Sequence, residues 1–456
     1  MQLVAYGAQD TYLTGQPSVT FFQAVYQQTT NFAMETIQQT VNGSPGNNGM
    51  LNVIVARNGD LLGQMEITLA PKGLAANCLT SDNASFDMNW VAERAIASVT
   101  LNIGGQQIDK HYQTWWRLYA ELFLSNANKE QYNKMTSALN PSSGFGGNSS
   151  TPYRVHLPLI FFFNRNPGLF LPLVALQYHE VRLDFTLTSY FTSYFDAATF
   201  EVWGNYVYLD NAERTQFASQ PAQYLIEQLQ HTGGDTISSV NETSPNNIRL
   251  NFNHPVKELI WCYQNPNPYT TSLNSMWNFT TDPANVQVSI DPLLLIGSNS
   301  LTLPNTLGSP MVMTGSNAFV NTYGGGRAAG TAGVYSSWTE EGRKVVGQYE
   351  VGPLHQFKIL LNGQDRFKEQ YGRYFNQIQP FYYHTGNPYP GIYCYSFAIQ
   401  PEEFQPTGSC NLSRIDVCQA WVALKAGSQS TIQKMFATNY NILNVASGMG
   451  GLAFSN

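Results

Sequence analysis

Residues 181–187 read Val-Arg-Leu-Asp-Phe-Thr-Leu, so four apolar side chains alternate with three polar ones. Successive side chains of a β-strand point to opposite faces, which gives such a strand one apolar and one polar face. This pattern is typical of antiparallel sheets that are packed on one side. The same alternation recurs at residues 97–103, 248–252 and 286–290. It predicts a mainly β protein.

Loops rich in Asn, Gly, Ser and Pro separate these strands, most clearly at residues 42–49, 140–152 and 297–333. Two segments, residues 112–123 and 367–378, instead space their aromatic and apolar residues at i, i+4 and i+7. That spacing predicts two helices, and each begins shortly after a glycine turn.

The two predicted helices occupy matching places in the two halves of the chain. The strand before the first helix ends at Gly104-Gly105, and the strand before the second ends at Asn362-Gly363. Two further pairs of triplets match in the same order, residues 175–177 with 398–400 and residues 182–184 with 414–416. The ordered set predicts an internal duplication. We therefore expect two tandem eight-stranded antiparallel jelly-roll β sandwiches, with short helices in long loops.

The predicted division has four parts. Residues 1–29 form an N-terminal arm, residues 30–210 the first jelly roll, and residues 248–456 the second jelly roll. Residues 211–247 are polar and are predicted to be a connector, with a short helical stretch near Tyr224–Leu229.

The amino-acid composition excludes several classes of function. Charged residues make up 12% of the 456 residues, about half of the ~25% that is usual for soluble proteins. The formal net charge is -7, so phosphate backbones are repelled and no direct nucleic-acid binding is expected. Hydrophobic residues reach 43%, which excludes an acidic disordered chain. A surface rich in uncharged polar residues suits extensive contact with other copies of the chain.

The cysteines and the apolar stretches indicate the compartment. Five widely spread cysteines are an odd number in a large chain, which favours reduced thiols over a disulfide framework. Residues 1–10 have no basic start and no apolar run, so no secretory signal is expected. The longest apolar stretches, residues 157–163 and 169–176, are shorter than the ~20 residues that cross a bilayer. We expect a soluble protein made in the cytoplasm.

No catalytic constellation stands out in the sequence. The phosphate-loop, zinc-protease and nucleophile-elbow motifs are absent, and no two of the seven histidines lie three or four residues apart. A metal site assembled through space stays an alternative to ordinary surface or strand histidines. The adjacent pairs Glu340-Glu341 and Glu402-Glu403 are predicted to be solvated loop charges. We therefore expect no enzyme, no cofactor and no metal.

Aromatic clusters and sequons leave a carbohydrate alternative open. Trp115-Trp116, Tyr190–Phe195 and Phe381–Tyr383 are predicted either to stack on sugars or to pack in cores and between subunits. N-x-[ST] sequons begin at six asparagines: Asn42, Asn83, Asn148, Asn241, Asn278 and Asn411.

Several stretches along the chain carry a family resemblance. Residues 2–10 read Gln-Leu-Val-Ala-Tyr-Gly-Ala-Gln-Asp, and Tyr12-Leu13-Thr14-Gly15 follows. The remaining matching stretches are residues 20–22, 31–35, 57–61, 253–259, 397–402, 406–416 and 447–456. Together they resemble the major capsid proteins of the nucleocytoplasmic large DNA viruses, and most closely the forms found in chlorella-type algal viruses.

The resemblance implies a structural role. It implies two consecutive jelly rolls and a homotrimer of pseudo-hexagonal outline, the capsomer, that tiles the icosahedral shell of a large double-stranded DNA virus. The N-terminal segment would lie at the capsomer base and join neighbours, and the loop at residues 297–333 would sit at the outer rim. The implied partners are other copies, minor capsid and penton proteins and, indirectly, the inner viral membrane. The implied location is the virion, after synthesis and assembly in the host cytoplasm.

Members of this family also carry glycans. The candidate acceptors in this chain are Asn278, Asn241, Asn148 and Asn83. One departure from basic members of the family lies at Gln27-Gln28, where arginines are frequent in relatives. The alternative function that the residues leave open is a jelly-roll carbohydrate-binding or glycan-processing protein.

Overall fold

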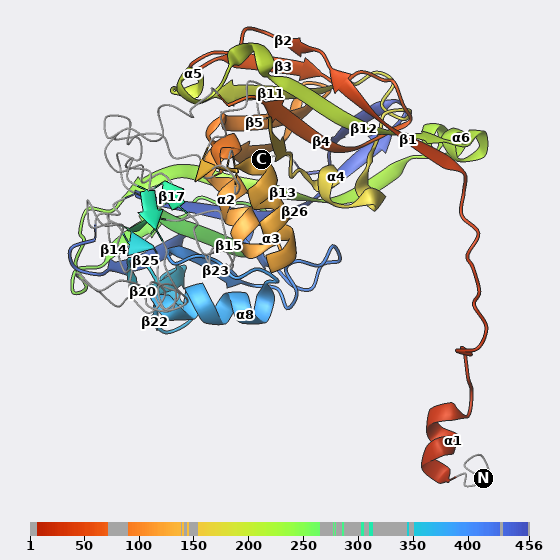
Figure 1. Ribbon diagram of the computed structural model, residues 1–456. Helices are drawn as coiled ribbons and strands as arrows, with labels where there is room; N and C mark the ends of the chain where they lie inside the picture. Colours follow the sequence, from red (N-terminus) through yellow and green to blue (C-terminus); the bar gives the residue numbers. More distant parts are fainter. Residues whose placement is uncertain are drawn as a thin grey trace.

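The computed structural model (Figure 1) describes residues 7–71, 90–137, 154–264, 277, 279, 351–428 and 432–454. Between these ranges it gives the backbone of six short strands: β7 (Leu139–Asn140), β8 (Gly144–Phe145), β16 (Asn285–Val286), β17 (Thr302–Pro304), β18 (Pro310–Val312) and β19 (Lys344–Val345).

The first half of the chain forms two facing sheets. One sheet has the order β1-β12-β4-β10, with β9 also paired to β4, and the other has the order β2-β3-β11-β5-β6. Their strands are β1 (Phe32–Gln39), β2 (Val41–Asn42), β3 (Met50–Ile54), β4 (Leu61–Leu69), β5 (Ile96–Ile103), β6 (Gln106–Tyr112), β9 (Val155–Pro158), β10 (Leu171–Pro172), β11 (Val181–Leu187) and β12 (Glu201–Leu209).

Helices occupy the connections of this first sandwich. They are η2 (Val91–Arg94), α2 (Gln113–Leu122), α3 (Asn126–Thr136), α4 (Phe162–Arg165), η3 (Pro167–Leu169), α5 (Phe191–Tyr194), η4 (Ala197–Thr199) and α6 (Asn211–Ser219). Helix α2 confirms the helix predicted at residues 112–123.

The second half forms another pair of sheets. One has the order β13-β26-β15-β23, with β24 and β27 added to β15 and β26, and the other has the order β14-β25-β20-β21, with β22 added to β20. Their strands are β13 (Ala222–Thr236), β14 (Asn246–Arg249), β15 (Pro255–Gln264), β20 (Leu354–Leu361), β21 (Gln364–Asp365), β22 (Gln370–Tyr371), β23 (Ile392–Ser396), β24 (Cys410–Asn411), β25 (Cys418–Leu424), β26 (Ile432–Ala446) and β27 (Met449–Leu452). Its helical elements are η6 (Tyr374–Ile378), α8 (Gln379–Tyr383) and η7 (Leu412–Arg414).

The strand orders of the two halves correspond. Across the first sheet of each half, the neighbouring strands β1, β12 and β4 match β13, β26 and β15. Across the second sheet, β3, β11, β5 and β6 match β14, β25, β20 and β21. All of these pairings are antiparallel. The structure is therefore a mainly β protein with two jelly rolls, as the alternating pattern predicted.

A tight hairpin marks the duplication most clearly. Gly104 and Gly105 join β5 to β6 with φ of 58° and 82°, and Asn362 and Gly363 join β20 to β21 with φ of 51° and 79°. Two successive residues with positive φ form the type I′ turn, which strongly favours Asn-Gly and Gly-Gly. The two dipeptides therefore occupy equivalent turns in the two halves, and they support the predicted duplication.

The matching triplets at residues 182–184 and 414–416 are not structurally equivalent, so that part of the argument for duplication is wrong. Val181 of β11 pairs with Ile103 at the end of β5, and Cys418 of β25 pairs with Leu361 at the end of β20. Position 181 thus corresponds to position 418, whereas the triplet at 414–416 lies before β25. The match of 182–184 with 414–416 is a coincidence of composition.

Two predictions about local structure also need correction. The helical stretch near Tyr224–Leu229 is a strand, because β13 pairs with β26 along its length and places part of the predicted connector in the second sandwich. The helix predicted from residue 367 starts later, because Gln370 and Tyr371 pair with β20 as β22. The helix that follows is a π-helical turn, η6, that continues into α8.

The two sandwiches share one hydrophobic core. Its largest cluster of buried residues includes Trp115 and Trp116 of the first half together with Ile226, Ile260 and Phe436 of the second. A second cluster lies within the second sandwich, where the Trp261 and Phe357 rings stack with centroids 4.4 Å apart. Because burial of apolar surface is the main stabilising contribution, the shared cluster joins the two halves into one body.

Candidate functional site: an exposed arm and the interface between the two halves

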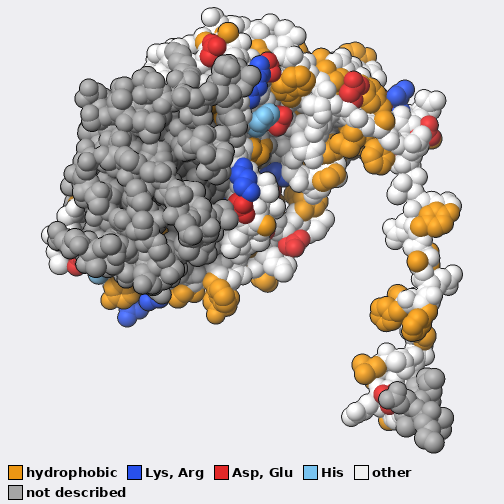
Figure 2. Space-filling model, in the orientation of Figure 1, with side chains coloured by type: hydrophobic (Ala, Val, Ile, Leu, Met, Phe, Trp, Pro, Cys, Tyr) orange, Lys and Arg blue, Asp and Glu red, His pale blue; other side chains and the backbone are white. Residues whose placement is uncertain are grey.

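The chain before β1 extends away from the sandwiches (Figure 1). Residues 7–31 contain the seven-residue helix α1 (Ala8–Thr14) and a turn at residues 21–23, and all of them are exposed. The large apolar side chains of this arm are 70–100% exposed: Tyr12, Leu13, Val19, Phe21, Phe22, Val25 and Tyr26. Figure 2 shows hydrophobic side chains along the arm. So much exposed apolar surface marks a contact site for another molecule.

The arm is also nearly free of charge. The first basic residue of the chain is Arg57, and within residues 7–31 the one charged side chain is Asp10. The Asp10 carboxylate accepts a hydrogen bond from Gly7 N at 3.0 Å at the start of α1. Anionic lipids and nucleic acids attract clusters of basic residues, so this arm is suited to an uncharged protein surface instead.

Helices α2 and α3 of the first half reach across to the second half. Gly386 N donates a hydrogen bond to Leu122 O at 2.8 Å, and Lys129 Nζ donates to Asn387 O at 2.8 Å. A Cβ at position 386 would lie 2.3 Å from Glu121 O, so this close approach of two backbones requires glycine.

Strands also cross-link the two halves. Leu229 N of β13 donates to Asp109 Oδ1 of β6 at 3.0 Å, and Leu452 N of β27 donates to Gln106 Oε1 at 3.1 Å. Together with the helix contacts, these bonds hold the two sandwiches in one fixed relation.

A buried ionic cluster holds α2 and α3 in position. The Arg117 guanidinium lies 3.5 Å from Glu93 Oε1 and 3.1 Å from Glu121 Oε1, and all three side chains are buried. It also lies over the ring of Trp90, 4.1 Å from the ring centroid. Lys129 Nζ completes the cluster at 2.8 Å from Glu121 Oε2. Removal of one partner from such a buried pair leaves an uncompensated charge and destabilises the folded protein.

Glu93 has the most unusual acidity in this cluster. Burial raises the pKa of its carboxyl from 4.5 to about 7, although Arg117 and the hydrogen bond from Tyr132 Oη, at 2.7 Å, act in the opposite direction. Perturbed carboxyls occur in active sites. Glu93 is fully buried under α2 and α3, however, so it does not reach a substrate and its role is structural.

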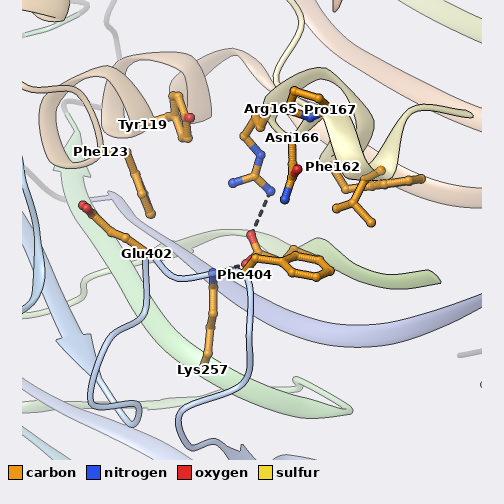
Figure 3. Close-up of a pocket in the computed structure, with 11 residues that line it drawn as sticks. Tyr119, Phe123, Phe162, Arg165, Asn166, Pro167, Lys257, Glu402 and Phe404 are labelled. Carbon is orange, nitrogen blue, oxygen red and sulfur yellow. Dashed lines mark hydrogen bonds and ion pairs between the residues drawn. The ribbon is translucent and has the colours of Figure 1, made fainter. Parts of the chain in front are cut away.

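A cleft of about 400 Å³ lies between the two halves (Figure 3). The first half lines it with Tyr119, Phe123, Phe162 and Arg165, and the second half with Lys257, Glu402 and Phe404. Glu227 joins its two cations, because it accepts hydrogen bonds from Arg165 Nη2, at 2.8 Å, and from Lys257 Nζ. Burial raises the pKa of Glu227, but Arg165 and Lys257 outweigh burial and lower it. The cleft thus combines aromatic walls with charges that are already paired.

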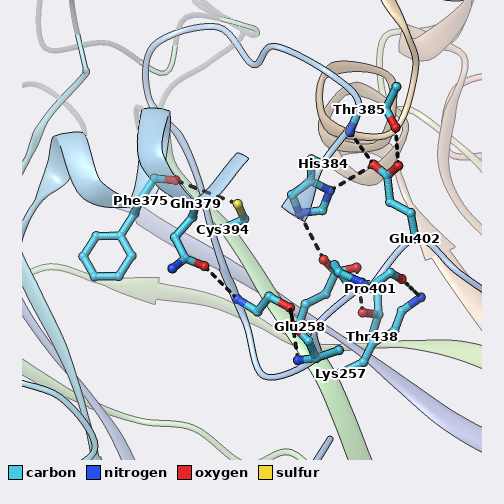
Figure 4. A network of polar contacts seen from close by, with 12 residues as sticks. Lys257, Glu258, Phe375, Gln379, His384, Thr385, Cys394, Pro401, Glu402 and Thr438 are labelled. Atoms are coloured by element: carbon cyan, nitrogen blue, oxygen red, sulfur yellow. Dashed lines mark hydrogen bonds and ion pairs between the residues drawn. The ribbon is translucent and has the colours of Figure 1, made fainter. Parts of the chain in front are cut away.

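Beside this cleft, His384 lies between two carboxylates (Figure 4). Its Nε2 is 3.2 Å from Glu258 Oε2, and its Nδ1 is 3.3 Å from Glu402 Oε1. Burial lowers the pKa of His384, but the nearby Cys394 and Glu258 outweigh burial and raise it well above its usual range. Glu402 lies in a loop and is exposed, as predicted, and its carboxylate also pairs with His384.

This group has the residue types of a catalytic triad but not its accessibility. Cys394 is buried, and burial raises the pKa of its thiol, so it is not a thiolate nucleophile. The contacts instead connect the end of α8 to β15 and to the loop at residue 402. Among the residues that the structure describes, no three His, Cys, Asp or Glu side chains converge as ligands for a metal ion.

The remaining predicted sites are only partly described. Asn241 is exposed, and its side-chain Oδ1 accepts hydrogen bonds from Thr243 N at 3.1 Å and Thr243 Oγ1 at 3.2 Å. Asn83, Asn148 and Asn278 lie outside the described residues. Within residues 297–333, the structure gives the backbone of the paired strands β17 and β18.

Comparisons with known proteins agree over the whole chain. The family model described as "Large eukaryotic DNA virus major capsid protein" matches residues 213–451, and "Major capsid protein N-terminus" matches residues 20–210. The major capsid protein of Paramecium bursaria Chlorella virus 1 is 38% identical, and the match covers 100% of this chain and 99% of that one. This chain belongs to the major capsid protein family of large eukaryotic DNA viruses.

Other members of the major capsid protein family give the same result. The protein of Phaeocystis pouchetii virus is 36% identical, over 100% of this chain and 99% of its own length. A chain of the quasi-atomic PBCV-1 virus capsid superposes with a TM-score of 0.71 and 36% identity, covering 96% of this chain and all of that one. The resemblance found in the sequence is thereby confirmed.

Membership in this family assigns a structural role in the virion capsid, and not an enzymatic one. The geometry fits that role. Trp115, Trp116, Phe191 and Phe195 are buried, so these aromatic clusters pack in the core and do not form a sugar platform. Phe381 and Tyr382, in contrast, are exposed. None of the helices in the described part of the chain is long and apolar enough to span a membrane.

Proposed function

We propose that this major capsid protein forms homotrimeric capsomers of pseudo-hexagonal outline, which tile the icosahedral shell of a large double-stranded DNA virus. The observation that carries the proposal is the repetition of one strand order in two sandwiches with a shared core. Three such chains around a threefold axis present six similar units, and closed cyclic symmetry is the usual form of homo-oligomers. Minor capsid proteins, penton proteins and, indirectly, the inner viral membrane are its further partners.

The exposed arm supports contacts beyond a single capsomer. Its apolar side chains lie outside both cores, so they contribute to contact rather than to folding. We propose that residues 7–31 join neighbouring capsomers at the base of the shell. The charge of -7 fits a shell protein that contacts other proteins and not the packaged DNA. Assembly takes place in the host cytoplasm, where the buried thiols of Cys262, Cys394 and Cys418 stay reduced.

Light scattering on the purified chain tests the oligomer directly. We expect a particle of about 152 kDa, three times the 50.7 kDa of one chain, with a hexagonal outline in negative-stain images of the same fraction. Deletion of residues 7–29 should leave this trimer intact and prevent lattices of trimers, because the arm contributes nothing to either core. A stable monomer under all salt conditions would exclude the capsomer.

Asn241 is our proposed glycan acceptor among the described candidates. Its amide is exposed, and the turn brings the Thr243 hydroxyl to 3.2 Å from it, so the sequon is accessible to a transferase. In protein from infected cells, Asn241→Gln should lower the intact mass by one glycan. Asn247→Gln is the matched control, because Asn247 is also exposed but begins no sequon. An unchanged mass of the Asn241 variant would exclude this site.

A further inference from the structure

We propose that the aromatic pair Phe21–Phe22 of the arm docks into the cleft between the two halves of a second copy of this chain. The inference rests on the proposed function, since it names the surface that receives the arm during self-assembly. The proposed function says only that the arm joins neighbouring copies, and this inference names the two surfaces that make the contact.

The arm presents the two rings as a projecting knob. Phe21 and Phe22 are 95% and 100% exposed, on a turn at residues 21–23. Phe22 N donates a hydrogen bond to Thr20 Oγ1 at 3.3 Å, which supports this turn. Aromatic side chains bury large areas with few rotatable bonds, and so they dominate the affinity of many interfaces.

The cleft has the size and the walls to receive such a knob. Its volume of about 400 Å³ falls in the range of ~300–1,000 Å³ typical of binding pockets. The rings of Tyr119, Phe123 and Phe404 line it, and all three are only half-buried in the free chain. In Figure 3, Phe123, directly after α2, lies between Tyr119 and Glu402, and Phe404 lies across from it beside Lys257. Rings entering between them would gain edge and face contacts.

The charges of the cleft favour an uncharged occupant. Glu227 pairs with both Arg165 and Lys257, and Glu402 pairs with His384. A charged ligand would have to compete with these bonds, and losing one partner of a buried pair is costly. Residues 11–31 of the arm carry no charge, so they enter without that penalty.

Equal numbers of the two surfaces favour another copy of the chain as the occupant. Each chain supplies one aromatic pair and one cleft, so a shell built from this chain contains one cleft for every aromatic pair. The ten residues from Phe22 to Asn31 span at most roughly 35 Å when extended, enough to carry the rings beyond their own sandwich. A knob on one surface and a hole on another make a head-to-tail contact, which can join many units in an extended lattice.

Photo-crosslinking in assembled particles tests the contact. Phe22→p-benzoylphenylalanine is introduced into isotopically heavy chains, which are mixed with light chains before assembly. We expect cross-links from position 22 to residues 162–169 or 402–404 of chains with the other label. The same probe at Gln28, also exposed on the arm, is the control and should not reach the cleft. Cross-links confined to one label, or to another surface, would overturn the proposal.

A peptide titration tests the same contact without requiring assembly. A fluorescent peptide of residues 16–27 is titrated against the full chain carrying Phe21→Ser and Phe22→Ser, whose own arm does not compete. We expect saturable binding that weakens at least tenfold when both phenylalanines of the peptide are replaced by serine. A Phe404→Ala substitution in the cleft should weaken it at least fivefold. Equal binding of the two peptides, or none, would overturn the docking site.

The outcomes separate this inference from the proposed function. Trimers seen by light scattering without arm–cleft cross-links would leave the capsomer standing and remove only the docking site. Absence of trimers would instead remove the proposed function, whatever the peptide does.

Discussion

Replacement of Arg117 by methionine is expected to lower the free energy of unfolding by about 3–5 kcal/mol. The guanidinium is the shared partner of Glu93 and Glu121, and all three groups are fully buried. Methionine has a similar length but no charge, so Glu93 loses the cation of Arg117 in the buried interior of the protein. The loss is large because Arg117 is the main group that stabilises the ionised carboxyl of Glu93, and it is greatest above about pH 7, where Glu93 is ionised. Glu121, in contrast, keeps Lys129 at 2.8 Å.

Chemical denaturation followed by tryptophan fluorescence measures this change, since Trp90 lies directly against Arg117. Lys134→Met is the matched control on the neighbouring helix. Lys134 pairs with Glu130, but their side chains are 59% and 44% exposed, so its loss should cost at most ~1 kcal/mol. Adding Glu93→Gln and Glu121→Gln to Arg117→Met should restore part of the stability. A loss equal to that of Lys134→Met would show that the cluster contributes little.

The architecture could be predicted because its signals are local. The alternation at Val181–Leu187 appears in the structure as a strand whose residues 181, 183, 185 and 187 are all buried. The dipeptides Gly104-Gly105 and Asn362-Gly363 specify their turns by backbone conformation alone. Both features can therefore be predicted from the sequence without knowledge of the tertiary contacts.

Strand β13 could not be predicted from its own pattern. Tyr224, Leu225, Ile226 and Leu229 have the spacing of a short amphipathic helix. Pairing with β26 over thirteen positions decides the conformation instead, and Leu229 and Ile226 are buried against the core shared with the first half. Tertiary contacts thus override a weak local preference.

The polar groups at the interface were missed for a similar reason. Glu93, Arg117 and Glu121 come from two elements, and only the Arg117–Glu121 spacing of four residues is visible in the sequence. His384, Glu258 and Glu402 are farther apart still. Ion pairs between distant elements leave no periodic signal, so the sequence placed Glu402 correctly in an exposed loop but did not predict its pairing with His384. The location of the exposed arm at the N-terminus, in contrast, could be predicted, but only through the family resemblance.

Glu93 should make the stability of the protein decrease as the pH rises from about 4.5 to about 7. In the folded chain its carboxyl has a pKa of about 7, against 4.5 when unperturbed. Between these values the folded state keeps a proton that the unfolded state has released, so a rise in pH favours unfolding. A shift of this size corresponds to about 3 kcal/mol, at ~1.4 kcal/mol for each pKa unit. The contribution is fully present below about pH 4.5 and is lost once the pH passes 7.

Urea denaturation at a series of pH values, compared between the wild type and Glu93→Gln, isolates this contribution. Glutamine still accepts the hydrogen bond of Tyr132 but does not titrate, so the variant's profile should be flatter by about 3 kcal/mol across this range. Glu130→Gln controls for the loss of a carboxyl, because the Glu130 side chain on α3 is 44% exposed and its replacement should leave the profile unchanged. Parallel profiles for the wild type and Glu93→Gln would mean that Glu93 is ionised in the folded chain throughout. Arg117 would then hold it as a permanent ion pair.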